Sequence, residues 1–357
     1  MTAARMSRLA MGGAIAGLLL LSALVAWQGW HEVLRAIERA GWALLLLVPL
    51  RLLTLALDAR AWQILLEAAL RTCSAGAAGP APGLLFLLWV ATVREAVNRL
   101  LPAGGVGGEV VGMRLVRTRL PDTAATAPIA ASVIVEVLLT IAVLYLFCGL
   151  GVVLMARIAA GMPQVWVIAA SLALSLPLPL LAWWLLRHAA PFQRLERWSV
   201  RLRGAHFPRL PALPDLDSAG LDAAVARLFG RHRRLLRALG WQLLSYLLGS
   251  LETWYALRLL GHPVDLTAAI AIEALTQAAR HASFLVPAGL GVQEAAVLLF
   301  GYLAGVGGEV ALSLALVKRM RETVLGLPAL LSWHWFEARQ FRRTRPAPRV
   351  RRRGLRR

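Results

Sequence analysis

The chain has 357 residues, of which 59% are hydrophobic and 16% are charged, and its mean hydropathy is +0.64. Soluble domains carry more charge and fewer apolar residues, so this composition excludes a chain with a soluble catalytic domain. The net charge of +20 does not indicate nucleic acid binding, because the arginines gather between and after apolar runs, at residues 187–237 and 339–357. Basic segments in such places are typical of the cytoplasmic loops of membrane proteins.

The first apolar run covers residues 11–30, after Arg5 and Arg8. It is too long for a secretory signal and no small-residue cleavage site follows it, so we predict a retained first span. A second span covers residues 42–57, because this run is also apolar and long. Residues 84–120 differ: an apolar start leads into charged residues, a proline- and glycine-rich break at 101–108, and a basic end. Basic flanks on both sides predict that this region enters and leaves the membrane at the cytoplasmic face.

The next spans cover residues 127–155 and 165–186, and Pro177 and Pro179 predict a kink in the latter. An arginine-rich loop at 187–238 follows. Its apolar residues at 221–236 have helical spacing, which indicates a helix on the membrane surface or a solvated loop helix. The chain then has a span at 239–260, a second broken region at 266–304 and a last span at 310–336.

These segments predict an all-α polytopic membrane protein. If the broken regions are re-entrant helical hairpins, six full spans remain; if each is a pair of spans, there are up to ten. Both counts place the N-terminus and the C-terminus in the cytoplasm. We expect a single transmembrane domain at residues 1–338, which includes the loop 187–238, and a basic cytoplasmic tail at 339–357. The expected location is the bacterial cytoplasmic (inner) membrane.

The two breaks share the spacing P-A-G-x-x-x-x-E and have a small polar residue four positions before the proline. The matching residues are Asn98, Pro102, Gly104 and Glu109 in the first break, and Ser283, Pro287, Gly289 and Glu294 in the second. Three spans separate the breaks, so the second enters from the opposite face, and the halves form an inverted repeat of the kind that marks a transporter's binding site. Interrupted backbone is tolerated at membrane depth only where protein or water satisfies it. The alternative interpretation is that these glycines only allow tight helix packing.

Charged residues within apolar runs are costly unless they are paired or face water. Lys318 and Glu322 share a helix face, as do Glu273 and Arg280, so salt bridges within each pair are one interpretation. For Arg94 and Arg280, in the arms that lead into the breaks, we predict a cavity-lining role. Glu109 and Glu294 either cap the new helices or contact substrate. The candidate substrate-binding or cavity residues are Arg94, Glu95, Asn98, Pro102, Gly104, Gly105, Glu109, Glu136, Glu273, Arg280, Ser283, Pro287, Gly289, Gly291, Gln293, Glu294, Lys318, Arg319 and Glu322.

The segments 98–109 and 284–294 resemble those of the flippase-like family that includes the transmembrane region of lysylphosphatidylglycerol synthases, and the resemblance covers nearly the whole chain. Residues 317–322 and 326–328 are most similar to the hopanoid-biosynthesis-associated HpnL-type membrane proteins. The resemblance implies lipid translocation between leaflets, of a hopanoid or another polar-headed lipid, with the paired broken helices as the site. Only the arginine tail follows the last span, in place of the synthases' soluble aminoacyl-transferase domain, so we do not expect lipid modification.

Two other functions stay open. An intramembrane transferase that acts on a lipid-linked sugar could use the D-x-D motif of Asp215 and Asp217, although such a motif is common by chance. A scaffold for lipid-synthesis enzymes would depend on the basic loop and tail. The two cysteines and seven histidines show no metal-ligand spacing, so we predict neither a metal nor a cofactor. The expected partners are membrane lipids, with anionic head groups at the basic loop and tail. A second copy of the chain and lipid-synthesis enzymes are the protein partners left open.

Overall fold

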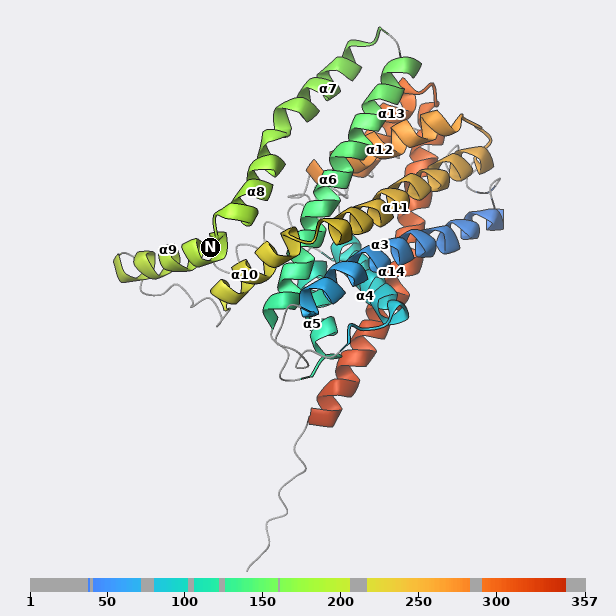
Figure 1. The fold of residues 1–357 in the computed structure, drawn as a ribbon. Coiled ribbons are helices and arrows are strands. Elements are labelled where there is room, and N and C mark those ends of the chain that lie inside the picture. Colours follow the sequence, from blue (N-terminus) through green and yellow to red (C-terminus); the bar gives the residue numbers. More distant parts are fainter. Residues whose placement is uncertain are drawn as a thin grey trace, which may run out of the picture.

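The structure is a computed structural model that describes residues 38, 41–71, 80–101, 106–121, 126–159, 161–205, 217–282 and 291–344. The fold is that of an all-α polytopic membrane protein, as predicted, and these ranges contain helices but no strand (Figure 1). The predicted first span at residues 11–30 lies outside the described residues. So do six of the candidate site residues: Pro102, Gly104, Gly105, Ser283, Pro287 and Gly289.

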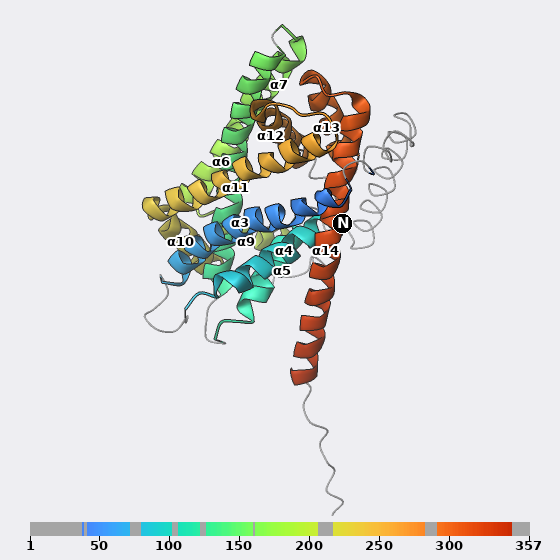
Figure 2. The same cartoon turned by 90° about the vertical axis from the view of Figure 1, so that its right-hand side faces the viewer.

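Two segments of the chain contain the same succession of helices. In the first, the 3-10 helix η1 (Gly41–Leu46) leads into α3 (Leu47–Leu70), followed by α4 (Leu84–Leu100), α5 (Gly107–Arg117) and the long α6 (Thr126–Ile158). In the second, α11 (His232–Leu259) is followed by α12 (Leu266–Ala282), α13 (Val292–Leu303) and the long α14 (Gly308–Thr344). Helices α3 and α11 lie side by side through the middle of the molecule (Figure 2).

The long helix of each segment supports the hairpin of the other one. Helix α14 packs along α4, and α6 packs along α12. Both contacts need a glycine: a Cβ atom on Gly326 of α14 would lie 2.5 Å from Leu100, and one on Gly151 of α6 would lie 2.6 Å from Ala274. The hairpins α4–α5 and α12–α13 lie toward opposite ends of the molecule (Figure 2). Their orientation relative to a membrane stays a prediction.

Three helical segments of the described chain are long and apolar enough to cross a membrane: Gly41–Leu70, Thr126–Ile158 and Pro163–His188. The last consists of α7 (Pro163–Ser175) and α8 (Pro177–His188), so the helix is interrupted where Pro177 predicted a kink. Helices α11 and α14, with 28 and 37 residues, also exceed the length that a bilayer requires, but they carry several charged side chains. The partners of these charges define the site described below.

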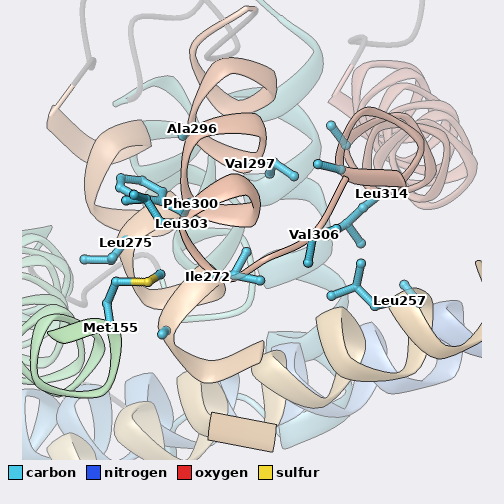
Figure 3. Packing of buried hydrophobic residues seen from close by; sticks show 14 of the residues in the cluster. Met155, Leu257, Ile272, Leu275, Ala296, Val297, Phe300, Leu303, Val306 and Leu314 are labelled. Atoms are coloured by element: carbon cyan, nitrogen blue, oxygen red, sulfur yellow. The ribbon is translucent and has the colours of Figure 1, made fainter. Parts of the chain in front are cut away.

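Each hairpin is surrounded by its own cluster of buried apolar side chains. One cluster joins α12 and α13 to the ends of α6, α11 and α14, with Phe300, Ile272 and Met155 among its members (Figure 3). The other joins α4 and α5 to α3, α6 and the later part of α14, around the fully buried Trp62. Buried ion pairs connect helices within and across these clusters, such as Arg94 of α4 with Glu136 of α6 and Lys318 of α14 with Glu273 of α12.

The arginine-rich loop differs from the sequence-based prediction. It contains α9 (Pro191–Ala205) and α10 (Ser218–Phe229), and α11 begins at His232, so the single helix predicted over residues 221–236 is wrong in extent. Asp217 caps α10, because its carboxylate accepts a hydrogen bond from Gly220 N at 2.7 Å. The apolar face of α10, with Leu221, Val225 and Leu228, is buried against α3 and α6. This face is therefore part of the protein core, and neither the membrane-surface nor the solvated interpretation holds.

Candidate functional site

A charged cavity lies between the two hairpins. Its larger compartment, about 400 Å³, is lined by α3, α4, α5, α6, α11 and α12, and a smaller compartment of about 110 Å³ extends to α13 and α14. The compartments adjoin, because they share six lining residues: Arg51, Asp58, Arg99, Tyr246, Arg280 and His281. Both hairpins contribute to this lining, mainly through their first arms, α4 and α12, and also through Glu109 of α5 and Gln293 of α13.

Arg94 of α4 is held in the larger compartment by two carboxylates and an aromatic ring. One guanidinium nitrogen donates hydrogen bonds to both oxygens of Glu136 on α6, at 2.9 and 3.2 Å, and another lies 3.5 Å from Glu109 on α5. The guanidinium also lies over the Trp62 ring, 4.7 Å from its centroid. Hydrogen bonds to ionised groups are stronger than neutral ones, and an arginine over an indole adds a cation–π attraction. Arg94 therefore joins α3, α4, α5 and α6 at the cavity wall.

The start of α5 is capped by a side chain from α4. The Asn98 oxygen accepts a hydrogen bond from Gly108 N at 2.8 Å, and the Asn98 amide donates to both Glu109 oxygens at 3.2 Å. Glu109 lies in the first turn of α5, where a carboxylate is favourable, but its carboxylate binds Asn98 and Arg94. A Cβ atom on Gly108 would clash with the Arg94 carbonyl oxygen, and one on Gly112 would lie 2.6 Å from the Arg94 side chain. The glycines after the first break thus do allow tight helix packing.

In the second hairpin, Glu294 caps its own helix as one of the two interpretations predicted. Its carboxylate accepts a hydrogen bond from Gly291 N at 2.8 Å and pairs with Arg319 of α14 at 2.9 Å, and it is fully buried. Gly291 has a φ angle of +77°, a conformation that residues with a Cβ atom rarely adopt. Beside it, Gln293 accepts a hydrogen bond from Arg280 at 3.3 Å. The start of α13 is thereby connected to both α12 and α14.

Several charged residues of α14 form ion pairs with residues of other helices. Lys318 pairs with Glu273 of α12, whose carboxylate also accepts hydrogen bonds from Thr253 and Gln277. Arg280 lies 3.8 Å from Glu322. The predicted pairs Lys318–Glu322 and Glu273–Arg280 are therefore wrong. The partners are exchanged: Lys318 pairs with Glu273, and Arg280 pairs with Glu322. Spacing reports which residues share a face, whereas the facing helix decides which charges meet.

Glu322 is the common partner of four arginines. Its side chain is 2% exposed and lies 3.1 Å from Arg319, 3.7 Å from Arg99, and 3.8 Å from both Arg280 and Arg321. Arg99 comes from α4 and Arg280 from α12, so this carboxylate joins the first arms of both hairpins to α14. Arg321 also pairs with Glu252 of α11. Removal of one member from a buried charge network leaves uncompensated charge, which makes such a network costly to break.

Residues 14–329 match the family described as Lysylphosphatidylglycerol synthase TM region. The chain belongs to this family. The match includes both hairpins, α14 up to Ala329 and every residue that lines the cavity. None of the curated proteins and none of the solved structures matches the chain.

In this member of the lysylphosphatidylglycerol synthase transmembrane family, most described candidate residues gather at the cavity or on the ion pairs around it. Arg94, Glu95, Asn98, Glu109 and Glu136 line the larger compartment. Glu273, Gln293, Lys318 and Glu322 line the smaller one, and Arg280 lines both. Gly291, Glu294 and Arg319 lie beside the cavity, in the cap and ion pair of α13. Substrate contact by any of them stays a prediction.

Arg51, Asp58 and Arg99 of this family member also line the cavity, although they were not among the residues predicted to do so. Arg51 donates from Nε to both oxygens of Glu95, at 3.1 and 3.2 Å, and thereby connects α3 to α4. Asp58 lies seven positions after Arg51, on the same face of α3. Arg51 lies inside the predicted span 42–57, and a charge there that shares a helix face with Asp58 was the available signal. No group of three or more His, Cys, Asp or Glu side chains could hold a metal ion in the part of the chain that the structure describes.

Proposed function

We propose that this protein moves polar-headed lipids between the leaflets of a membrane, as a transporter and not as an enzyme. The observation that carries the proposal is the charged cavity of about 400 Å³ to which both hairpins contribute. Hydrocarbon gives no partners to a lipid head group, so its passage needs a polar path through the protein. The cavity offers both cationic and anionic partners for such a head group.

Arg99 and Arg280 are the proposed contacts for an anionic part of the head group. They come from the first arms of the two hairpins and line both compartments. The Arg99 guanidinium lies 3.7 Å from both Glu95 and Glu322, which is longer than a hydrogen bond. A phosphate oxygen between the two arginines would form charge-assisted hydrogen bonds in place of these long contacts.

A hopanoid with a polar head is one proposed substrate, and a phosphate-bearing lipid is another. The finer sequence resemblance that favours a hopanoid rests on residues 317–322 and 326–328. In the structure, Lys318, Arg319, Arg321 and Glu322 form the ion pairs of α14, and Gly326 forms the close contact with α4. These packing contacts and ion pairs account for the motif without a bound lipid. The motif therefore does not identify the substrate, and translocation of a hopanoid must be compared directly with translocation of a phosphate-bearing lipid.

The experiment is lipid translocation in vesicles reconstituted with the purified protein, followed with head-group-labelled phospholipids and a labelled hopanoid. We expect wild-type protein to accelerate movement between leaflets. Arg99→Gln and Arg280→Gln should reduce the rate of a phosphate-bearing lipid by at least about tenfold, because a lost charged hydrogen bond costs about 1.5–3 kcal/mol. The matched control is Arg114→Gln, an exposed arginine of α5 outside the cavity, which should move lipid at the wild-type rate.

The cavity variants, together with a variant that lacks residues 339–357, also test the alternatives, in vesicles and in cells. A scaffold would tolerate the cavity substitutions and lose its cellular role when residues 339–357 are removed. A transferase would consume a lipid-linked sugar, and the described half of the D-x-D motif, Asp217, caps α10. Equal translocation by wild-type protein, Arg280→Gln and protein-free vesicles would contradict the transport proposal.

A further inference from the structure

Asp58 differs from every other acidic side chain that lines the cavity. Each of the other acids lies within 4.0 Å of an arginine or lysine nitrogen: Glu95, Glu109, Glu136, Glu252, Glu273 and Glu322. Asp58 has no ion pair of this kind among the described residues, although it lines both compartments. Asp58 is therefore the one acid of the described lining without a direct ion pair, and Arg51 attracts its charge only from farther away.

The fixed charges of the described lining balance only when Asp58 is neutral. Against the six glutamates stand six cations: Arg51, Arg94, Arg99, Arg280, Lys318 and Arg321. A seventh carboxylate adds one uncompensated negative charge in a region of low dielectric, where such a charge is costly. A carboxylic acid in this place reduces the cost by taking up a proton.

Asp58 lines both compartments of the cavity and therefore faces the charged groups of both. It lies on α3 where this helix runs along α11, at the junction of the two structural segments. The charged and titratable groups that share the compartments with it are Arg51 of α3, Arg94, Glu95 and Arg99 of α4, Glu109 of α5, Glu136 of α6, Tyr246 and Glu252 of α11, Glu273, Arg280 and His281 of α12, and Lys318, Arg321 and Glu322 of α14. Helix α10 also packs on α3, but its buried Asp222 accepts hydrogen bonds from the backbone of Phe192 and Gln193 instead.

We propose that Asp58 is a proton-binding site and that lipid movement is coupled to its protonation, an inference that rests on the proposed lipid translocation. Uptake of one proton from water converts the carboxylate to a carboxylic acid, and release of that proton restores the carboxylate. The neutral acid leaves the lining balanced, so an anionic head group can approach Arg99 and Arg280. The ionised form adds a negative charge to the same cavity and opposes that approach. A proton and an anionic head group thus favour each other's binding.

The first test compares lipid movement in reconstituted vesicles over a series of pH values and under pH gradients of both directions. Wild-type movement of an anionic phospholipid should fall as the pH rises, by up to about tenfold per pH unit, because each unit changes the protonated-to-ionised ratio of one acid tenfold. Asp58→Asn mimics the protonated acid and should give movement that depends neither on pH nor on the gradient. Glu67→Gln, an acid of the same helix outside the cavity, should keep the wild-type profile.

The second test observes the proton directly, by infrared spectroscopy of the purified protein as the pH changes. A protonated-carboxyl band should appear in wild-type protein and be missing from Asp58→Asn. Persistence of the band or of the wild-type pH profile in Asp58→Asn overturns the inference. Loss of pH dependence in His281→Gln, with Asp58 intact, also overturns it. A band that titrates in wild-type protein without any lipid movement would instead refute the proposed function and leave the proton site standing.

Discussion

Lys318 of α14 forms an ion pair with Glu273 of α12, a residue 45 positions earlier in the chain. Both side chains are buried, with exposures of 6% and 8%. Because Glu273 also accepts hydrogen bonds from Thr253 and Gln277, the pair connects α11, α12 and α14 in one network. This network holds the first arm of the second hairpin against α14, which carries two of the cavity's six cations, Lys318 and Arg321.

Loss of Lys318 should therefore destabilise the protein more than loss of a surface lysine would. We expect Lys318→Ala to reduce the free energy of unfolding by about 3–5 kcal/mol, because Glu273 is left buried without its cation. The double variant Lys318→Met, Glu273→Met should be destabilised by less than the sum of the losses in the single variants Lys318→Met and Glu273→Met. Thermal unfolding in detergent measures this, and strictly additive effects would show that the two side chains do not interact.

Gly108 and Gly149 should respond in opposite ways to the same substitution. Gly108→Ala places a methyl group against the Arg94 carbonyl oxygen and should separate α4 from α5, with a loss of about 1–3 kcal/mol. Gly149→Ala in α6 meets nothing within 4 Å and should stabilise that helix by up to about 1 kcal/mol. The thermal midpoints of the two variants give the comparison. Equal effects would contradict the close packing of the first hairpin.

Asn98→Ala should loosen α5 at its start. The change removes the acceptor for Gly108 N and the amide that binds Glu109, and loss of a helix cap costs about 0.5–2 kcal/mol. Hydrogen exchange should become faster at the first amides of α5. The first amides of α13 serve as the internal control, because Glu294 caps that helix independently. Unchanged exchange at Gly108 would show that Asn98 is not the cap.

Glu322→Ala should leave four arginines without their common carboxylate. We expect a loss of about 3–5 kcal/mol in stability, since the removed group compensates buried positive charge. A small carboxylate such as acetate can occupy the space that the deletion creates, so added acetate should partly restore the thermal midpoint. Glu337→Ala, the loss of a more exposed partner of Arg114, should cause little change and show no rescue. Equal midpoints of Glu322→Ala with and without acetate would count against a charge deficit at this place.

The order of the helices could be read from the sequence because apolar runs alternate with charged segments and with proline- and glycine-rich breaks. The kink at Pro177 also followed from local chemistry, since proline cannot continue the hydrogen-bond ladder. The end of α10 did not follow, because helical spacing continues past Gly230 into the start of α11. The first span and the prolines of both breaks lie outside the described residues, so the retained first span and the breaks at Pro102 and Pro287 stay predictions.

The partners of the charges were not predictable from one sequence. Lys318 and Glu322 share a face of α14, but α12 brings Glu273 to the first and α4 brings Arg99 to the second. These encounters depend on how the long helix of one segment packs on the hairpin of the other. Asp58 was overlooked because it directly follows the predicted span 42–57, where a charged residue is expected at the end of a span.

The central claim is that a lipid head group enters the cavity between the two hairpins, and photo-crosslinking with a phospholipid that carries a photoreactive head group tests it most directly. The adducts, mapped by mass spectrometry, should fall on cavity residues such as Tyr246 and Thr140 and should decrease in Arg280→Gln. Adducts confined to the exposed face of α7 and α8, at residues such as Trp166 and Leu178, would contradict the account.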